Sequence, residues 1–231
     1  MKKRCVMSLF ALTAFFSFSC GIAVQKTGAS AEIIKGTVTV TAGGQSMPLI
    51  TGARIDEGCS VTTGPDGVAV ISLNDGSARF EVQQDTEFDF QTISAGVKKF
   101  TVRRGSVWNW IRKLKKDEQF TVDAPTAVVG VRGTKFYVFR QGDMDGICHC
   151  EGSVQTTDKS TGTSGTDGAD TLSFSKNGKT IILTSADLAS VGFSHNHSAL
   201  TDSPLGAKSR PNPVVMGKVM AIVADKFSKL K

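Results

Sequence analysis

The 231-residue sequence lacks any long hydrophobic run. Its first apolar stretch, residues 5–16, is too short to span a bilayer as a stable helix, and no later stretch is longer. This stretch follows the basic residues Lys2, Lys3 and Arg4, an order that is typical of an export signal. We therefore predict that residues 1–19 are removed and that the remaining chain works outside the cytoplasm.

The end of this signal places Cys20 directly after small residues. The junction resembles a bacterial lipobox, in which the cysteine becomes an acylated N-terminus. Ser17 stands where leucine is usual, so an ordinary secreted protein cleaved near Cys20 is the alternative. Several acyl chains anchor a protein far better than one. We predict a membrane anchor through lipid at Cys20 and a tether over residues 20–31, with the chain facing the periplasm or the cell surface.

A strong excess of positive charge is also missing. The whole chain carries a net charge of +6, from 27 basic and 21 acidic residues. Residues 1–19 contain three of the basic residues and no acidic one, so the remainder carries only +3. A nucleic-acid-binding protein usually has a clearer basic footprint. The charge therefore predicts no nucleic-acid partner, and an unknown envelope protein or glycan is the partner that we expect.

Helical periodicity is absent from residues 32–156. Short runs alternate apolar and polar side chains, and Gly, Asp and Asn bound them. This pattern predicts strands joined by tight turns, and turn signals at such short intervals point to a sandwich, roll or barrel. The predicted fold class is all-β: a single β-roll or jelly-roll-like sandwich of many short strands over residues 32–156, with one C-terminal helix.

The composition changes after this region. Residues 157–170 contain no large apolar side chain and predict a flexible Ser/Thr/Gly loop. Residues 171–193 predict a hairpin that extends the sheet, with its turn at Asn177–Gly178. Residues 194–231 combine an irregular segment with a helix over 214–230. The apolar stripe of that helix favours packing on the protein's own body, and a partner or membrane surface is the alternative.

A phosphate-binding loop is absent as well. Only two residues separate Gly130 from Gly133, the lysine is not next to a glycine, and an apolar run follows where a helix would be needed. Pro125 favours extended chain at Ala124, and Gly133 permits a bend. The stretch 124–139 therefore predicts a strand, a bend and a strand. Because no nucleophile elbow or pair of carboxylates stands on an identifiable scaffold, we predict no catalytic residue and no enzyme.

Few cysteines follow the signal: after Cys20 there are only Cys59, Cys148 and Cys150. In a non-reducing compartment these three allow one disulfide and one spare thiol. Cys148 and Cys150 alternate with His149, so both sulfurs point the same way on a strand. We predict a bond from Cys59 to one of the other two, and the sequence leaves open which.

The two neighbouring cysteines also form, with His195 and His197, the one set of residues that resembles a metal site. Cysteine and histidine are ligands that suit zinc. However, Cys-x-Cys is an unusual spacing for structural zinc, and the histidines follow about 45 residues later, beyond the serine-rich stretch. We therefore predict a disulfide or free thiols, with no metal and no cofactor. The alternative is a metal- or haem-binding component of envelope iron sensing or handling.

Residues 103–116 combine six basic residues with Trp108 and Trp110. Basic residues interleaved with aromatic ones can bind anionic glycans. A solvated basic turn beside Asp117 and Glu118 is the favoured interpretation. If the chain binds an anion, the predicted surface consists of Arg103, Arg104, Arg112, Lys113, Lys115, Lys116 and Trp110.

A line of landmarks runs through residues 33–156. It includes the opening KGTVTV, the turn TTGPDG, the strand GSVW and the closing EGSV. Its most specific block consists of Pro125, Thr126, Ala127, Val131, Arg132, Gly133, Thr134 and Phe136. This order resembles the FecR domain, the periplasmic part of the ferric-citrate regulator.

The resemblance implies an all-β extracytoplasmic module for binding or scaffolding. Membrane regulators of this family also carry a segment that engages a sigma factor and a transmembrane helix, and the sequence shows no match to either. The iron-signalling role is therefore not carried over. The predicted function is that of a lipid-anchored, non-catalytic binding or scaffold protein of the bacterial cell envelope.

Overall fold

The computed structural model describes residues 28–205 and 212–230. The described chain forms two nine-stranded sheets and two helices. In spatial order, sheet 1 consists of β18 (Lys179–Leu183), β17 (Thr171–Lys176), β14 (Met144–Glu151), β13 (Lys135–Gln141), β10 (Ser106–Ile111), β7 (Ala78–Val82), β6 (Val68–Leu73), β1 (Ala29–Lys35) and β4 (Arg54–Ile55).

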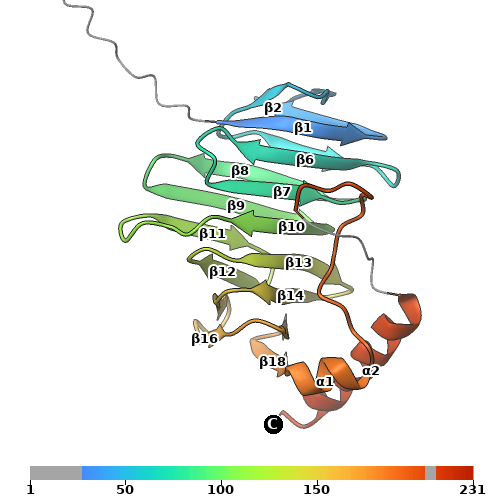
Figure 1. The fold of residues 1–231 in the computed structure, drawn as a ribbon. Helices are drawn as coiled ribbons and strands as arrows, with labels where there is room; N and C mark the ends of the chain where they lie inside the picture. Colours follow the sequence, from blue (N-terminus) through green and yellow to red (C-terminus); the bar gives the residue numbers. More distant parts are fainter. Residues whose placement is uncertain (1–27, 206–211, 231) are drawn as a thin grey trace, which may run out of the picture.

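Sheet 2 packs against sheet 1 across a shared core. Its strands, in spatial order, are β16 (Ser164–Asp167), β15 (Val154–Asp158), β12 (Ala127–Val131), β11 (Gln119–Asp123), β9 (Val97–Arg104), β8 (Glu87–Ile93), β5 (Ser60–Thr63), β2 (Val38–Ala42) and β3 (Gln45–Pro48). Neighbouring strands are antiparallel except for β9 and β11, which are parallel. Figure 1 shows the strands stacked from β1 and β2 at one end to β16 and β18 at the other, where α1 (Ser185–Ser190) and α2 (Pro213–Ser228) lie.

A cluster of phenylalanines joins the two sheets. Phe80 on β7 contacts four phenylalanines of sheet 2, with ring centroids 4.7–6.2 Å apart. These four are Phe88, Phe90, Phe100 and Phe120, and all five rings are buried. Because side chains alternate between the faces of a strand, these rings point into one shared core. The all-β prediction is confirmed, and α1 is an addition to it.

The stretch around Gly133 is a strand, a bend and a strand, as the sequence predicts. The strand β12 ends at Val131 and β13 begins at Lys135, so the bend carries the chain from sheet 2 to sheet 1. Gly133 has φ +97°, and a Cβ at this position would lie 2.6 Å from the Cα of Lys113. Glycine is required there by both the backbone conformation and the lack of space.

The C-terminal elements follow the prediction with two corrections. Asn177 and Gly178 both have positive φ in the turn between β17 and β18, and this hairpin extends sheet 1 along β14. The helix α2 buries Val219 and Val223 against the protein's own body. The flexible loop expected over 157–170 is wrong in part, because β16 pairs there with β15. The expected tether over 20–31 ends earlier, because β1 begins at Ala29.

We expect Phe80→Ala to lower the free energy of unfolding by about 3–5 kcal/mol, because the substitution leaves a cavity between the sheets. Urea denaturation of the purified chain measures this change. Ile50→Ala is the matched control: its side chain is 67% exposed, so the change should stay within about 0.5 kcal/mol. Equal losses in both variants would show that the phenylalanine cluster does not hold the sheets together.

Candidate metal centre

One row of side chains crosses the outward face of sheet 1. Cross-strand pairing aligns Val70 with Glu81, Glu81 with Trp108, Trp108 with Tyr137, and Tyr137 with Cys148. The row continues from Cys148 to Leu172 on β17. These residues alternate with the core residues of the same strands, so they face away from the phenylalanine cluster.

Residues 193–205, which we call the strap, follow α1 and run back along this row (Figure 1). Leu200 and Leu205 pack in one apolar cluster with Val70 and Trp108. The ring of His197 stacks on Tyr137, with centroids 4.4 Å apart and an interplanar angle of 4°. The strap therefore passes over β14 and β13 first and then over β7 and β6, so it runs from later strands of the chain back to earlier ones.

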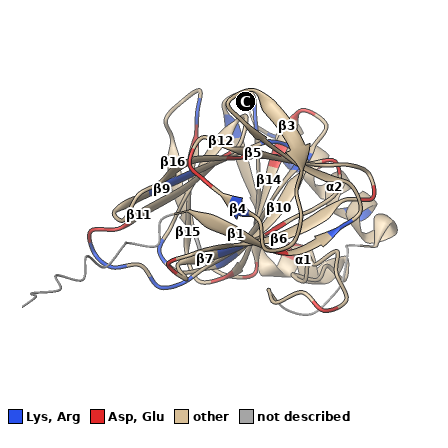
Figure 2. Cartoon of the chain, turned by 90° about the horizontal axis from the view of Figure 1, so that it is seen from above, with Lys and Arg blue, Asp and Glu red and all other residues tan. Residues whose placement is uncertain are grey.

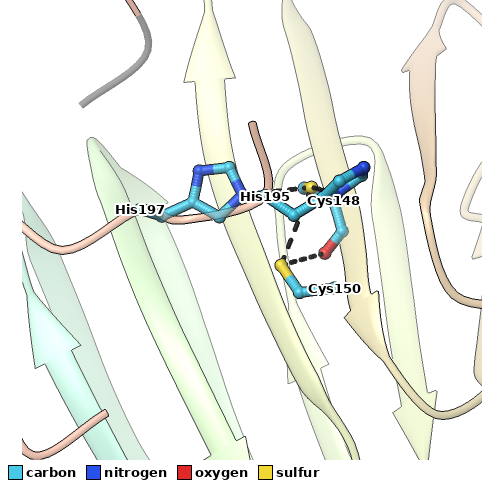
Figure 3. A group of neighbouring side chains, drawn as sticks. All are labelled: Cys148, Cys150, His195 and His197. Atoms are coloured by element: carbon cyan, nitrogen blue, oxygen red, sulfur yellow. Dashed lines mark hydrogen bonds between the residues drawn. The ribbon is translucent and has the colours of Figure 1, made fainter. Parts of the chain in front are cut away.

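Four ligand-type side chains meet where the strap passes β14. Cys148 and Cys150 come from β14, and His195 and His197 come from the strap (Figure 3). Their four ligand atoms all lie within 4.8 Å of one another. The Sγ of Cys148 lies 3.0 Å from Nδ1 of His195, 3.1 Å from Nε2 of His197 and 3.7 Å from Sγ of Cys150.

These distances approach the edges of a zinc tetrahedron. With Zn–S near 2.3 Å and Zn–N near 2.0–2.1 Å, tetrahedral geometry places two sulfurs about 3.8 Å apart and a sulfur and a nitrogen about 3.6 Å apart. The sulfur pair at 3.7 Å fits this edge. The sulfur–nitrogen pairs are at hydrogen-bond distance and would lengthen by about half an ångström around an ion. All four atoms lie within 4.8 Å of one another, so a pair at this limit would close by about 1 Å around a single ion.

The protonation of the two thiols favours a metal ligand set. The contact with the Cys148 thiol, together with contacts with His195 and His197, lowers the pKa of Cys150 to about 3. Burial raises the pKa of Cys148. Cys150 is therefore held as a thiolate at neutral pH, and the thiolate is the form of cysteine that binds metals.

Groups around the ligands also contact the imidazoles. Nε2 of His195 lies 3.9 Å from a carboxylate oxygen of Asp170, so the second ring nitrogen faces an acid while the first faces Cys148. The ring of Trp108 lies edge-on to the ring of His197, with centroids 6.1 Å apart, and the ring of Tyr137 stacks on the ring of His197. Carboxylates that hydrogen-bond metal-bound histidines commonly support the site, and Asp170 would take this role by moving about 1 Å closer.

The disulfide expected from Cys59 is not formed, because all three cysteines are free in the structure. Cys59 precedes β5 and packs against the core between the sheets, whereas Cys148 and Cys150 lie in the cluster on the outward face of sheet 1. The body of the sandwich separates them. The expectation that both sulfurs of Cys-x-Cys share one face is confirmed by their contact.

The basic residues of the stretch 103–116 are not gathered in one surface. Arg103 and Arg104 end β9, where Arg103 pairs with Asp89 at 2.6 Å. The loop after β10 contains Arg112, whose guanidinium contacts Glu118 at 2.8 Å and lowers the pKa of that carboxyl. A six-residue strand of about 20 Å lies between the two groups.

The other members of the expected anion surface follow the same division. Lys113, Lys115 and Lys116 lie in the loop after β10 with Arg112, whereas Trp110 packs in the cluster under the strap. Seen along the stack, basic and acidic segments are interspersed (Figure 2). The favoured interpretation as a solvated turn agrees with this arrangement.

Sequence reasoning identified the four metal-type residues but did not predict that they meet. The available signal was the matched spacing of Cys-x-Cys and His-x-His. Their convergence depends on the path of the strap over sheet 1, which is a long-range property.

Part of the two-sheet sandwich matches a known family model. Residues 60–155 match the family model described as FecR protein. This segment runs from β5 to β15 and includes both cysteines of the candidate centre, but it includes neither histidine and no part of the strap or of α2. No curated protein matches the chain.

Two crystal structures of a candidate anti-sigma factor from Parabacteroides distasonis ATCC 8503 are similar to this chain. The first, at 2.50 Å resolution, is 13% identical, with a TM-score of 0.48, and the match covers 57% of this chain and 62% of that one. The second, at 1.65 Å, is 14% identical, with a TM-score of 0.48 and coverages of 58% and 63%. The chain thus spans less than two thirds of the structures that it matches.

The landmarks that resemble the FecR domain fall largely inside the matched segment, and the first of them lie in β1 and β2 of the same two sheets. The match to the FecR family model covers residues 60–155 of the 231-residue chain.

Proposed function

We propose that this protein is a non-catalytic regulatory module of the cell envelope, in which the FecR sandwich binds one zinc ion at Cys148, Cys150, His195 and His197. The observation that carries the proposal is the convergence of four ligand atoms within 4.8 Å from two separate elements. A set of two sulfurs and two imidazole nitrogens is typical of tetrahedral zinc. Copper(I) and iron(II) are competing occupants, which the metal titration distinguishes.

The ligand count supports a structural or sensing role for the ion. Catalytic zinc sites usually have three protein ligands and keep one position open for water or substrate. Here four ligand atoms lie within 4.8 Å of one another, Cys148 and His197 are buried, and the aromatic rings of Tyr137 and Trp108 flank the site. A set of four protein ligands with no open position favours a structural zinc ion over a catalytic one.

Attachment to the envelope is the second part of the proposal. Cys20 and the signal lie outside the described residues, so the support comes from the sequence alone: a basic start, a short apolar stretch and a cysteine after small residues. Among the described residues, no helix combines the length and apolar character needed to cross a membrane. A lipid at Cys20 would hold the FecR sandwich at the membrane surface, where an envelope protein or glycan is the proposed partner.

We expect the reduced, metal-free mature chain to bind one zinc ion per molecule, measured by isothermal titration with elemental analysis after dialysis. Cys150→Ser and His195→Asn each remove one ligand and should weaken binding by more than about 100-fold, which exceeds the usual cost of an outer-shell change. Cys59→Ser is the matched control, because that thiol is remote from the centre, and it should bind like the unchanged chain.

Failure to retain stoichiometric zinc would overturn the proposed metal site. Equal binding by Cys59→Ser and Cys150→Ser, with loss in neither, would show that the ion binds elsewhere. Preference for copper(I) or iron(II) in competition titrations would correct the identity of the ion.

We expect Asp170→Asn to weaken zinc binding by about tenfold while leaving the fold unchanged. The substitution removes the charge that faces His195, and second-shell changes usually cost 10–100-fold. Asp170 has φ +61°, and asparagine tolerates this left-handed conformation. Zinc titration measures the affinity, and thermal unfolding of the metal-free protein checks the fold. An unchanged affinity would show that Asp170 does not support the ligand.

We expect labelled palmitate to appear on the full chain at Cys20 when it is expressed in bacteria, and inhibition of lipoprotein signal peptidase to block maturation. Cys20→Ala should move the protein from the membrane fraction to the soluble fraction, because the acyl chains supply the anchoring energy. Cys59→Ala is the control and should stay membrane-bound. A Cys20→Ala protein that remains in the membrane fraction would contradict the anchor.

A further inference from the structure

The strap is attached to sheet 1 in two chemically different ways. Its first part, residues 193–197, carries the two histidines that meet Cys148 and Cys150. Its second part, residues 198–205, is attached through hydrogen bonds to a buried carboxylate and through apolar packing. The first attachment would involve the metal, and the second does not.

Glu81 is the anchor of the second part. It points outward from β7 and its side chain is fully buried under the strap. Its carboxylate accepts hydrogen bonds from Oγ of Ser198 at 2.8 Å, the backbone amide of Ala199 at 2.6 Å and Oγ of Ser203 at 2.5 Å. A buried carboxylate without such donors would be very costly, so this attachment is strongly favoured.

Apolar packing strengthens the same part. Leu200 and Leu205 are buried with Val68, Val70 and Trp108 on the outward face. Removing both leucines from this cluster would return apolar surface to water, at roughly 25 cal/mol per Å². These contacts involve none of the four metal ligands.

The first part is held at the ligands and also at His197, whose ring stacks on Tyr137 and whose backbone carbonyl accepts a hydrogen bond from Gln83. His195 and His197 both contact Cys148, and Phe193 lies edge-on to His195 with ring centroids 5.3 Å apart. The histidines come from the strap and the cysteines from β14, so only the docked arrangement presents all four ligands to one ion. Zinc must therefore bind the docked state more tightly than a state in which this part has lifted from β14.

We propose that zinc locks residues 193–197 onto β14, while Glu81 holds residues 198–205 in place with or without the ion. This inference rests on the proposed metal site and names its regulation. At a free zinc concentration of 100 times Kd, the docking equilibrium of the first part shifts by about a hundredfold. Release of the ion then leaves His197 held by only Tyr137 and Gln83, so the short segment between α1 and the Glu81 anchor lifts more readily and uncovers Cys148 and Cys150 on the outward face.

Hydrogen–deuterium exchange of the mature chain tests this division, with zinc in one arm and a metal chelator with reductant in the other. We expect amides in peptides spanning 191–197 to exchange at least about tenfold faster without zinc, and those spanning 198–205 to exchange equally in both arms. His195→Asn with zinc should behave like the chelated chain, and Cys59→Ser should behave like the unchanged chain.

Variants of the anchor give the opposite pattern. Glu81→Gln should speed exchange in residues 198–205, and zinc should still protect 191–197. Ser198→Ala removes one donor and is a milder variant if Glu81→Gln does not fold. In limited proteolysis, chymotrypsin should cut after Phe193 only when zinc is absent.

The results separate this inference from the proposed function. Absence of stoichiometric zinc would remove both. Stoichiometric zinc with equal exchange of 191–197 in the two arms would overturn the lock and leave the metal site standing. Simultaneous release of the whole strap on chelation would also overturn it, because the Glu81 anchor would then depend on the ion.

Discussion

The alternation of side chains along the strands of sheet 1 is the constraint on which the molecule depends. Phe80 points inward and meets four phenylalanines of sheet 2, while its neighbour Glu81 points outward and binds the strap. A shift of one residue in β7 would exchange these faces, exposing the ring and driving the carboxylate into the core. With the register set in this way, Glu81, Tyr137 and Cys148 fall on one outward row, and the strap docks along it.

The candidate centre joins a part of the chain that matches a known family model to a part that lies outside the match. Cys148 and Cys150 belong to the segment that matches the FecR family, whereas His195 and His197 follow it. The family match alone therefore does not imply a metal. An ion bound here would connect the segment that matches the FecR family to the C-terminal part of the chain, in which Asp187 of α1 also pairs with Lys226 of α2.

Features with a local cause were predictable from the sequence. The alternation of short strands, the turn at Asn177–Gly178 and the C-terminal helix all depend on residues near one another in the chain. The strand β16 was not predicted, because the backbone pairing with β15 orders it without large apolar side chains. The meeting of His195 with Cys148 was not predictable either, since it requires the cross-strand register and the path of the strap together. The same long-range information places Cys59 away from the other cysteines.

The central claim is that four side chains from two elements surround one ion. X-ray absorption at the zinc edge of the loaded, reduced protein tests it most directly, because this spectrum reports the ligand elements and their distances. The account predicts a shell of two sulfurs near 2.3 Å and two imidazole nitrogens near 2.0–2.1 Å. A shell made only of oxygen and nitrogen, or one with a sulfur count other than two, would contradict it.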